Sequence, residues 1–351
     1  MADPARRDAP HKKSLSDIFN HFAKDSVERF PDLKGQILFL DMNEYVVYGR
    51  DEIDYKKTGL TPKTAQAYIK DYSLTRKMRK DKDYPSYAIY EDKKHLSFLL
   101  FNDRIPANEL QDVSQKTEKD ILYILDHELA HLAIQNGASD KRNDLHETVI
   151  GEAVADAYAQ IRYYQRFGVD SEHGHYIVDP WFRATAMIFN EDTEHFTSFV
   201  LDEIVKRKNM IDFEGLAPDQ TAELAWRFAM QYTPSVLVLE KVTANLKPIR
   251  EAFEKAPESD AWLKTLAQIT LDPKTDYYTF RVCKTVLAGY LAGKPDWNNQ
   301  PVNAAGAYWD DVRVKLKERE FRFAQEDILF NLAPAKPKPP QPPANQNQPK
   351  L

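Results

Sequence analysis

The chain has 351 residues, of which 42% are hydrophobic and 29% charged, and its formal net charge is −6. This composition is typical of a soluble protein with one large or two ordinary domains, and the slight acidic excess argues against a nucleic-acid-binding surface. The single cysteine, Cys283, excludes an internal disulfide. It lies among apolar residues, which predicts a buried thiol. We expect no membrane association, because no apolar run reaches the length that spans a bilayer.

The two ends of the chain have compositions that cannot form a packed core. Residues 1–13 mix charge with proline and lack the apolar region of a secretion signal, so we expect a disordered leader and a cytoplasmic protein. Secretion as an effector without a signal would leave the same pattern. Residues 333–351 are rich in proline, lysine, glutamine and asparagine and are expected to be disordered. Their P-x-x-P spacing could dock on a partner, or the segment is a plain tail.

Helical and strand-like segments alternate over the first hundred residues. Residues 14–30 are expected to form an amphipathic helix, opened by a capping box of Ser14 and Asp17. Two short β-type runs follow at 36–40 and 45–48, then a helix at 61–80. A second hairpin is expected from runs at 87–90 and 96–101. The strand at 96–101 is apolar on both faces, so it is either an exposed edge that binds extended peptide or an interior strand.

The segment His127-Glu128-Leu129-Ala130-His131 places H-E-x-x-H within a helical pattern. Thr117 and Asp120 suggest its N-terminal cap and Gly137 its end. Because four residues make slightly more than one turn, His127 and His131 lie on one face and can bind one divalent metal ion. Glu128 is beside that face, where a general base could reach a metal-bound water. The competing interpretation is a surface helix with two solvated histidines.

A second helical pattern follows over residues 146–158 and carries Glu152 and Asp156 on one face. Its small residues, Ala153 and Ala157 among them, would allow close packing against the first helix. Here the sequence resembles the gluzincin (thermolysin-like) zinc metallopeptidases, whose pattern is H-E-x-x-H followed by E-x-x-x-D on the next helix. The resemblance covers residues 117–160 and identifies no specific family within the group.

The resemblance implies a role for each acidic residue of the second helix. Glu152 would be the third zinc ligand, and Asp156 would orient a ligand histidine through its other ring nitrogen. An alternative pair of ligands, His146 and Glu147, remains open, although a polar pair at a helix start is also expected as capping chemistry. The metzincin pattern is excluded, because Gly137 occupies its third-histidine position.

The loop after the second helix offers further polar groups. In thermolysin-like enzymes a histidine or tyrosine beyond the ligands stabilises the oxyanion of the tetrahedral intermediate. The nearest residues of these types are His173, His175, Tyr176 and, farther on, His195. Each of them could equally be a solvated side chain.

The remainder of the chain reads as helices at 181–189, 192–206, 218–232, 234–253, 260–271, 277–292 and 304–323. We therefore expect an α+β fold. It would combine a zincin-like metallopeptidase domain (14–180), with a small antiparallel or mixed sheet and the active-site helices, and an all-helical subdomain (181–332).

The sequence predicts a zinc metallopeptidase that holds one Zn²⁺ per chain through His127, His131 and Glu152. Glu128 would act as the general base towards a peptide or protein substrate. An endopeptidase is favoured, because no G-x-M-E-N element is present to bind a free amino terminus. The alternative is a helical interaction protein with a vestigial or structural metal site, which would have no use for Glu128 as a base.

Overall fold

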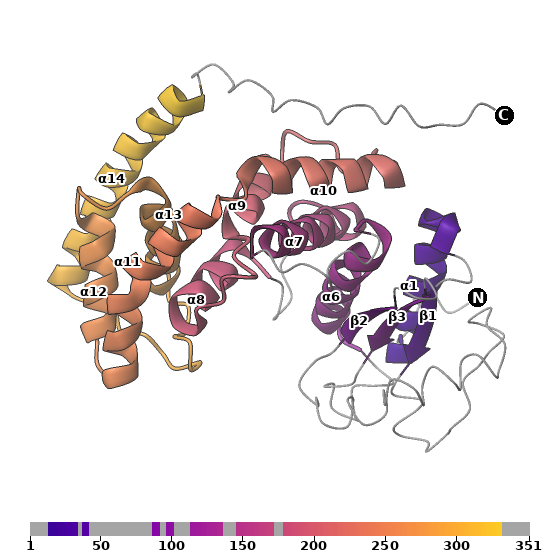
Figure 1. Cartoon of the computed structure of the whole chain (residues 1–351). Helices are drawn as coiled ribbons and strands as arrows, with labels where there is room; N and C mark the ends of the chain where they lie inside the picture. The colour runs from indigo at the N-terminus through magenta and orange to yellow at the C-terminus, as the bar shows by residue number, and fades with distance from the viewer. Residues whose placement is uncertain are drawn as a thin grey trace, which may run out of the picture. The chain divides into compact units, whose positions relative to one another are not determined.

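The structure is a computed structural model that describes residues 13–33, 37–41, 86–91, 96–101, 113–135, 145–171 and 178–331. The chain divides into two compact units, residues 1–250 and 251–351 (Figure 1). The expected leader (1–13) lies outside the described residues except for its last residue. The expected strand (45–48), helix (61–80) and tail (333–351) lie outside them entirely. Within the described residues, no helix has both the length and the apolar character needed to cross a membrane.

The first helix of unit 1, α1 (Leu15–Arg29), forms where the sequence predicts it. The Ser14 side chain accepts a hydrogen bond from the Asp17 N–H, and the Asp17 carboxylate accepts one from the Ser14 N–H, so the predicted capping box is confirmed. A short 3₁₀ turn, η1 (Pro31–Leu33), follows the helix. The apolar face of α1 is fully buried against α6 (Gln115–Ala133), with each large side chain contributing about 1.5–3 kcal/mol. Its residues are Leu15, Ile18, Phe19 and Phe22.

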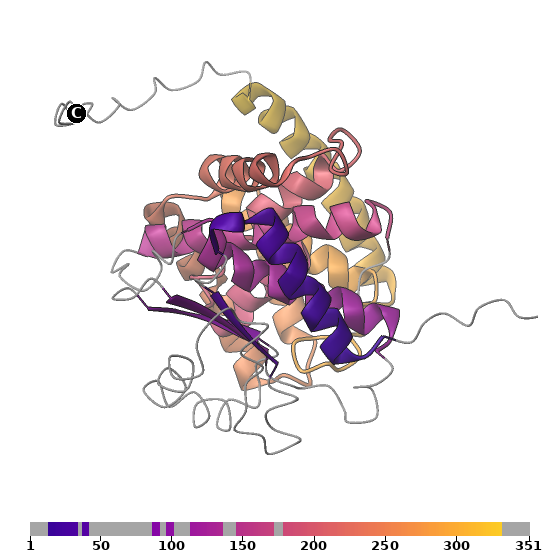
Figure 2. The same cartoon turned by 90° about the vertical axis from the view of Figure 1, so that its right-hand side faces the viewer.

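Three strands form a small mixed sheet: β1 (Ile37–Asp41), β2 (Ser86–Glu91) and β3 (Leu96–Phe101). They lie in the order β1-β3-β2, side by side in Figure 2. The β2–β3 pair is antiparallel, which confirms the predicted second hairpin, and β1 runs parallel to β3. Because β3 lies between the other two strands, it is interior in the described sheet and not an exposed edge.

The expected α+β fold class is wrong, because the described part of the chain is helical in character. The two buried clusters of unit 1 are built by helices packing on helices, and the only described side chain from the sheet that joins them is the half-buried Phe39. The strand-like runs do pair, but the strands are only five or six residues long.

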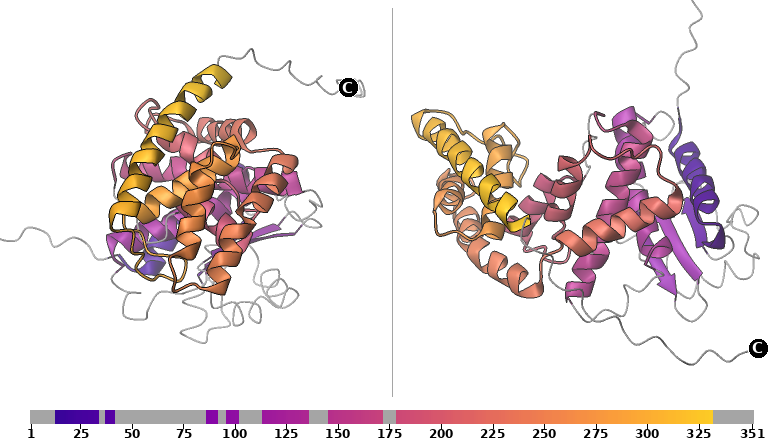
Figure 3. Two further views of the ribbon diagram at one scale, coloured as in Figure 1. Left: turned by 90° about the vertical axis from the view of Figure 1, so that its left-hand side faces the viewer. Right: turned by 90° about the horizontal axis from the view of Figure 1, so that it is seen from above.

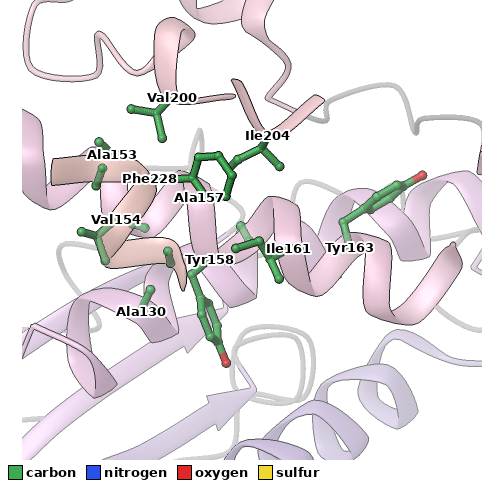
Figure 4. Packing of buried hydrophobic residues seen from close by; sticks show 14 of the residues in the cluster. Ala130, Ala153, Val154, Ala157, Tyr158, Ile161, Tyr163, Val200, Ile204 and Phe228 are labelled. Atoms are coloured by element: carbon green, nitrogen blue, oxygen red, sulfur yellow. The ribbon is translucent and has the colours of Figure 1, made fainter. Parts of the chain in front are cut away.

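The main core of unit 1 surrounds α7 (Leu145–Phe167), a 23-residue helix. Against it pack α6, α9 (Ser198–Lys206) and α10 (Pro218–Tyr232), while α8 (Pro180–Asn190) packs on α9. Figure 4 shows Ala130, Ala153 and Ala157 in this cluster, where small side chains allow the backbones to approach closely. The helix α10 has the predicted bounds, whereas α9 begins six residues later than the predicted Asp192.

Unit 2 is built from helices whose positions follow the periodicity of the sequence. They are the end of α11 (Val236–Lys255), α12 (Ala261–Leu271), α13 (Tyr277–Leu291) and α14 (Ala307–Asn331), drawn orange to yellow in Figure 3. The rings of Trp262 and Tyr290 meet edge to face at 5.1 Å, and the Arg319 guanidinium lies 4.9 Å from the Phe280 ring centre. Cys283 is buried as predicted, and burial raises the pKa of its thiol.

Candidate metal centre

The helix that carries H-E-x-x-H is fixed by its cap and by its apolar face. Its N-cap is Ser114, whose hydroxyl accepts a hydrogen bond from the Thr117 N–H at 3.2 Å, so Thr117 is not the cap that the sequence suggested. Leu125 and Leu129 are fully buried against α1. Because these leucines point towards α1, the residues on the other side of α6 face α7.

Besides its cap and its apolar face, an ion-pair network holds α6 in place. Asp126, directly before the first histidine, is buried and accepts hydrogen bonds from both terminal nitrogens of Arg166 at 2.7 and 3.2 Å. Arg166 and Arg162 on α7 also contact Asp25 of α1. Burial raises the pKa of Asp126 although the arginines oppose that shift. The network restricts the rotation of α6 about its own axis, and therefore the direction in which its histidines point.

The structure brings the three predicted ligands together. The Nε2 atoms of His127 and His131 are 3.2 Å apart. His127 Nε2 lies 3.3 Å from Glu152 Oε2, and His131 Nε2 lies 3.5 Å from Glu152 Oε1. Within the described part of the chain, these three residues form the one group whose potential ligand atoms all lie within 4.8 Å of one another. The alternative ligand His146 is not part of that group.

The spacing of these atoms fits zinc. Ligand atoms placed 2.0–2.1 Å from a tetrahedral ion are about 3.3 Å from each other. The two Nε2 atoms are 3.2 Å apart, and each lies 3.3–3.5 Å from one oxygen of Glu152, a different oxygen for each histidine. Glu152 Oε2 is buried and receives no hydrogen bond of good geometry, although His127 Nε2 and His195 Nε2 lie 3.3 and 3.4 Å away. A cation at this position would compensate its charge. Two imidazoles and one carboxylate are a ligand set that zinc accepts with one position left open. The three side chains are 12–16% exposed, so the centre is not closed to small molecules.

Asp156 stands directly behind His127 and is itself held from several sides. Its Oδ1 is 2.8 Å from His127 Nδ1, and Arg183 binds both carboxylate oxygens, at 2.7 and 2.8 Å. The Thr197 hydroxyl, at the N-cap of α9, donates to Oδ2. Burial alone would raise the pKa of Asp156, but the charge of Arg183 and the hydrogen bonds from His127 and Arg183 hold it well below its usual range. Asp156 is therefore a permanent anion that orients the His127 ring.

The charges of the ligands follow from this arrangement. Burial by itself lowers the pKa of His127, but its hydrogen bonds and charge interactions with Asp156 and Glu152 outweigh that effect and raise the pKa to about 10. Burial by itself raises the pKa of Glu152, but the two adjacent histidines outweigh that effect and hold the pKa well below the usual value. Without a metal ion, the centre is thus a protonated imidazole between two carboxylates, and a cation must displace that proton to bind.

A second histidine–carboxylate pair lies beside the ligands. His195 Nε2 is 3.4 Å from Glu152 Oε2, and His195 Nδ1 is 2.8 Å from Asp192 Oδ1. The His195 side chain is 38% exposed. It reaches this position because residues 192–197 are not helical, contrary to the helix predicted from Asp192. Burial lowers the pKa of His195, but the hydrogen bond that His195 donates to Asp192 and the charge of Glu152 raise it above the ordinary value.

The other predicted site residues have different outcomes. Glu128 is half-buried on α6, directly after the first ligand, where its role as base stays a prediction. His173, His175 and Tyr176 lie outside the described residues, so their roles stay predictions too.

Three residues that the sequence analysis missed lie next to the ligands or their partner: Arg183, Thr197 and Gln135. Arg183 and Thr197 lie 27 and 41 positions beyond Asp156, and nothing local in the sequence connects them to it. Gln135 could have been found, because it follows His131 by four positions and so continues the face of the two histidines.

Comparisons with known proteins add no identification. The chain matches no protein-family model, no curated protein and no solved structure. The functional conclusion therefore depends on the chemistry of the site and on the motif itself.

Proposed function

We propose that this protein is a zinc-dependent peptidase whose metal ion is held by His127, His131 and Glu152. The observation that carries the proposal is the convergence of these three side chains, one ligand atom of each lying within 4.8 Å of the others, with the two Nε2 atoms 3.2 Å apart. The resemblance of the H-E-x-x-H and E-x-x-x-D motifs to those of gluzincins supports it. So does the hydrogen bond between His127 and Asp156, a pairing that is usual behind zinc-bound histidines.

A bound zinc ion would supply a Lewis acid that lowers the pKa of a water molecule and polarises a peptide carbonyl. Glu128 then takes the proton of the attacking water and delivers it to the leaving amine. His195, oriented by Asp192 and partly exposed beside Glu152, is placed to donate a hydrogen bond to the oxyanion. Because its pKa is raised, His195 carries the proton that this role requires over a wider pH range than a free imidazole does.

An accessible centre with three protein ligands favours catalysis over a structural role. Structural zinc sites are usually closed by a fourth protein ligand. His195 is the nearest further histidine, but within the described residues it does not join the group of mutually close ligand atoms. We propose an endopeptidase acting on peptide or protein substrates, because the sequence has no G-x-M-E-N element for a free amino terminus.

Glu128→Gln tests the proposal most directly. Glutamine keeps nearly the same shape but cannot accept the proton of water, so the variant should retain about one zinc per chain and lose peptide hydrolysis by several orders of magnitude. The measurements are metal analysis and cleavage of a mixed peptide library, with wild type and His127→Ala as references. Folded wild-type protein that takes up no zinc would refute the metal site. Zinc binding without any cleavage would favour the interaction protein with a structural or vestigial metal.

A further inference from the structure

Gln135 is a buried polar residue at the end of the helix that carries both histidines. It follows the C-cap residue Ile134, its own N–H bonds to the Ala130 carbonyl, and only 4% of its surface is exposed. A buried amide must satisfy both of its ends, because an unpaired polar group in a protein interior costs about 1–3 kcal/mol. The partners of its two ends therefore show what the residue does.

Each end of the amide contacts a different part of the centre. The Nε2 group donates to the Gly151 carbonyl at 2.7 Å, and Oε1 lies 3.4 Å from His131 Nδ1. Because a backbone carbonyl only accepts hydrogen bonds, the NH₂ group must face Gly151, which leaves Oε1 facing the histidine. An amide oxygen also only accepts, so Nδ1 of His131 carries the proton and its Nε2 keeps the lone pair.

That lone pair points at the candidate centre, since His131 Nε2 is 3.2 Å from His127 Nε2 and 3.5 Å from Glu152 Oε1. Asp156 has the same effect on His127, because its carboxylate accepts a hydrogen bond at 2.8 Å and so requires a proton on Nδ1. Both histidines thus bond an acceptor through Nδ1. The acceptor is a buried carboxylate for His127 and a neutral amide for His131.

We propose that Gln135 is a positioning residue that fixes His131 as an Nε2 metal ligand. This inference rests on the proposed metal site. The bond to Gly151 adds a second effect, because Gly151 directly precedes Glu152 on α7. One side chain thereby links the helix of two ligands to the backbone next to the third. A histidine free to rotate or to change tautomer binds metal more weakly, and losses of about 10- to 100-fold are usual when such a partner is removed.

Two substitutions separate the role of the acceptor from that of burial. Gln135→Met has a similar shape and neither accepts nor donates, so zinc affinity measured by chelator competition should fall about 10- to 100-fold. Gln135→Glu keeps an acceptor and makes it charged, which makes the imidazole a stronger ligand. This variant also loses the donor to the Gly151 carbonyl, so its zinc affinity should lie between those of Gln135→Met and wild type, and its Co²⁺-substituted form should show shifted d–d absorption bands.

Gln160→Met is the matched control, because Gln160 is an equally buried glutamine on α7, eight positions beyond Glu152. It should leave zinc affinity and the Co²⁺ spectrum unchanged. The proposal is overturned if Gln135→Met binds zinc as wild type does, or if Gln135→Glu is as weak as Gln135→Met. Should Gln135→Met fail to fold, a Gln135→Glu spectrum superimposable on that of wild type overturns it equally. Wild-type protein without zinc affinity would instead refute the metal site itself.

Discussion

Asp156→Asn removes the charge on which the arrangement behind His127 depends, with almost no change in shape. The carboxylate accepts four hydrogen bonds: one from His127, two from Arg183 and one from Thr197. Asparagine has one acceptor oxygen and one NH₂ group. If the oxygen accepts from His127, the NH₂ group faces the Nε–H of Arg183, where donor meets donor, and the Thr197 hydroxyl must turn to accept instead of donating.

The expected cost follows from burial. The side chain of Asp156 is fully buried and that of Arg183 is 9% exposed, so the substitution leaves the guanidinium charge buried and unpaired. Breaking one side of a buried ion pair costs about 3–5 kcal/mol. For a unit of this size, that corresponds to a fall of about 6–20 °C in the melting temperature of metal-free protein. Zinc affinity should fall about 10- to 100-fold, equivalent to about 1.4–2.8 kcal/mol.

Denaturant unfolding of metal-free protein measures the first quantity, and chelator competition measures the second. Arg183→Met and the double variant complete a double-mutant cycle. Because the two residues contact each other directly, the double variant should be more stable than the sum of the single effects predicts, by about 0.5–3 kcal/mol. A loss below about 1 kcal/mol for Asp156→Asn, or strict additivity in the cycle, would show that the Arg183 pair does not hold Asp156 as argued.

Three further outcomes are expected. Glu152→Ala should release zinc while His146→Ala binds nearly normally; a zinc titration giving the reverse result would disprove the ligand set. Folding raises the pKa of His127 from 6.5 to about 10, so protonation of this histidine stabilises the metal-free fold. This contribution is complete below about pH 6.5 and is lost as the pH rises towards 10. Zinc must displace that proton, so apparent affinity should rise about tenfold per pH unit below 10, and a flat profile in chelator competition would contradict this. His195→Gln should lower kcat about 10²- to 10³-fold with zinc content unchanged, and unaltered peptide hydrolysis would exclude the oxyanion role.

The sequence predicts well those features that depend on residues close together in the chain. The face shared by His127 and His131 follows from helix geometry alone, and so does the face shared by Glu152 and Asp156. The helix α10 and the capping box of α1 were predicted for the same local reason. The N-cap of α6 was placed three residues too late, because Ser and Thr both serve as N-caps and both occur there.

Features that depend on tertiary packing were not predictable in the same way. A small sheet and the active-site helices were expected to build the metallopeptidase domain together, yet helices build nearly all of the described core of unit 1. Helical periodicity continues through residues 192–197, but there the chain forms a loop in which His195 bonds to Asp192. Helix propensity is a local property, so it could not predict that this loop brings the His195 imidazole within 3.4 Å of Glu152.

The segment after residue 180 shows how the fold and the site are connected. The sequence favoured a boundary there, between a metallopeptidase domain and a separate helical subdomain. In the structure the compact unit extends to residue 250. Arg183 and Thr197 reach Asp156 from beyond that expected boundary, and His195 reaches Glu152. Asp156 stays ionised in a fully buried position because Arg183 neutralises it, so the orientation of His127 depends on where α8 packs. The helices beyond residue 180 therefore help to orient His127, the first proposed ligand. The two H-E-x-x-H histidines alone do not define the centre.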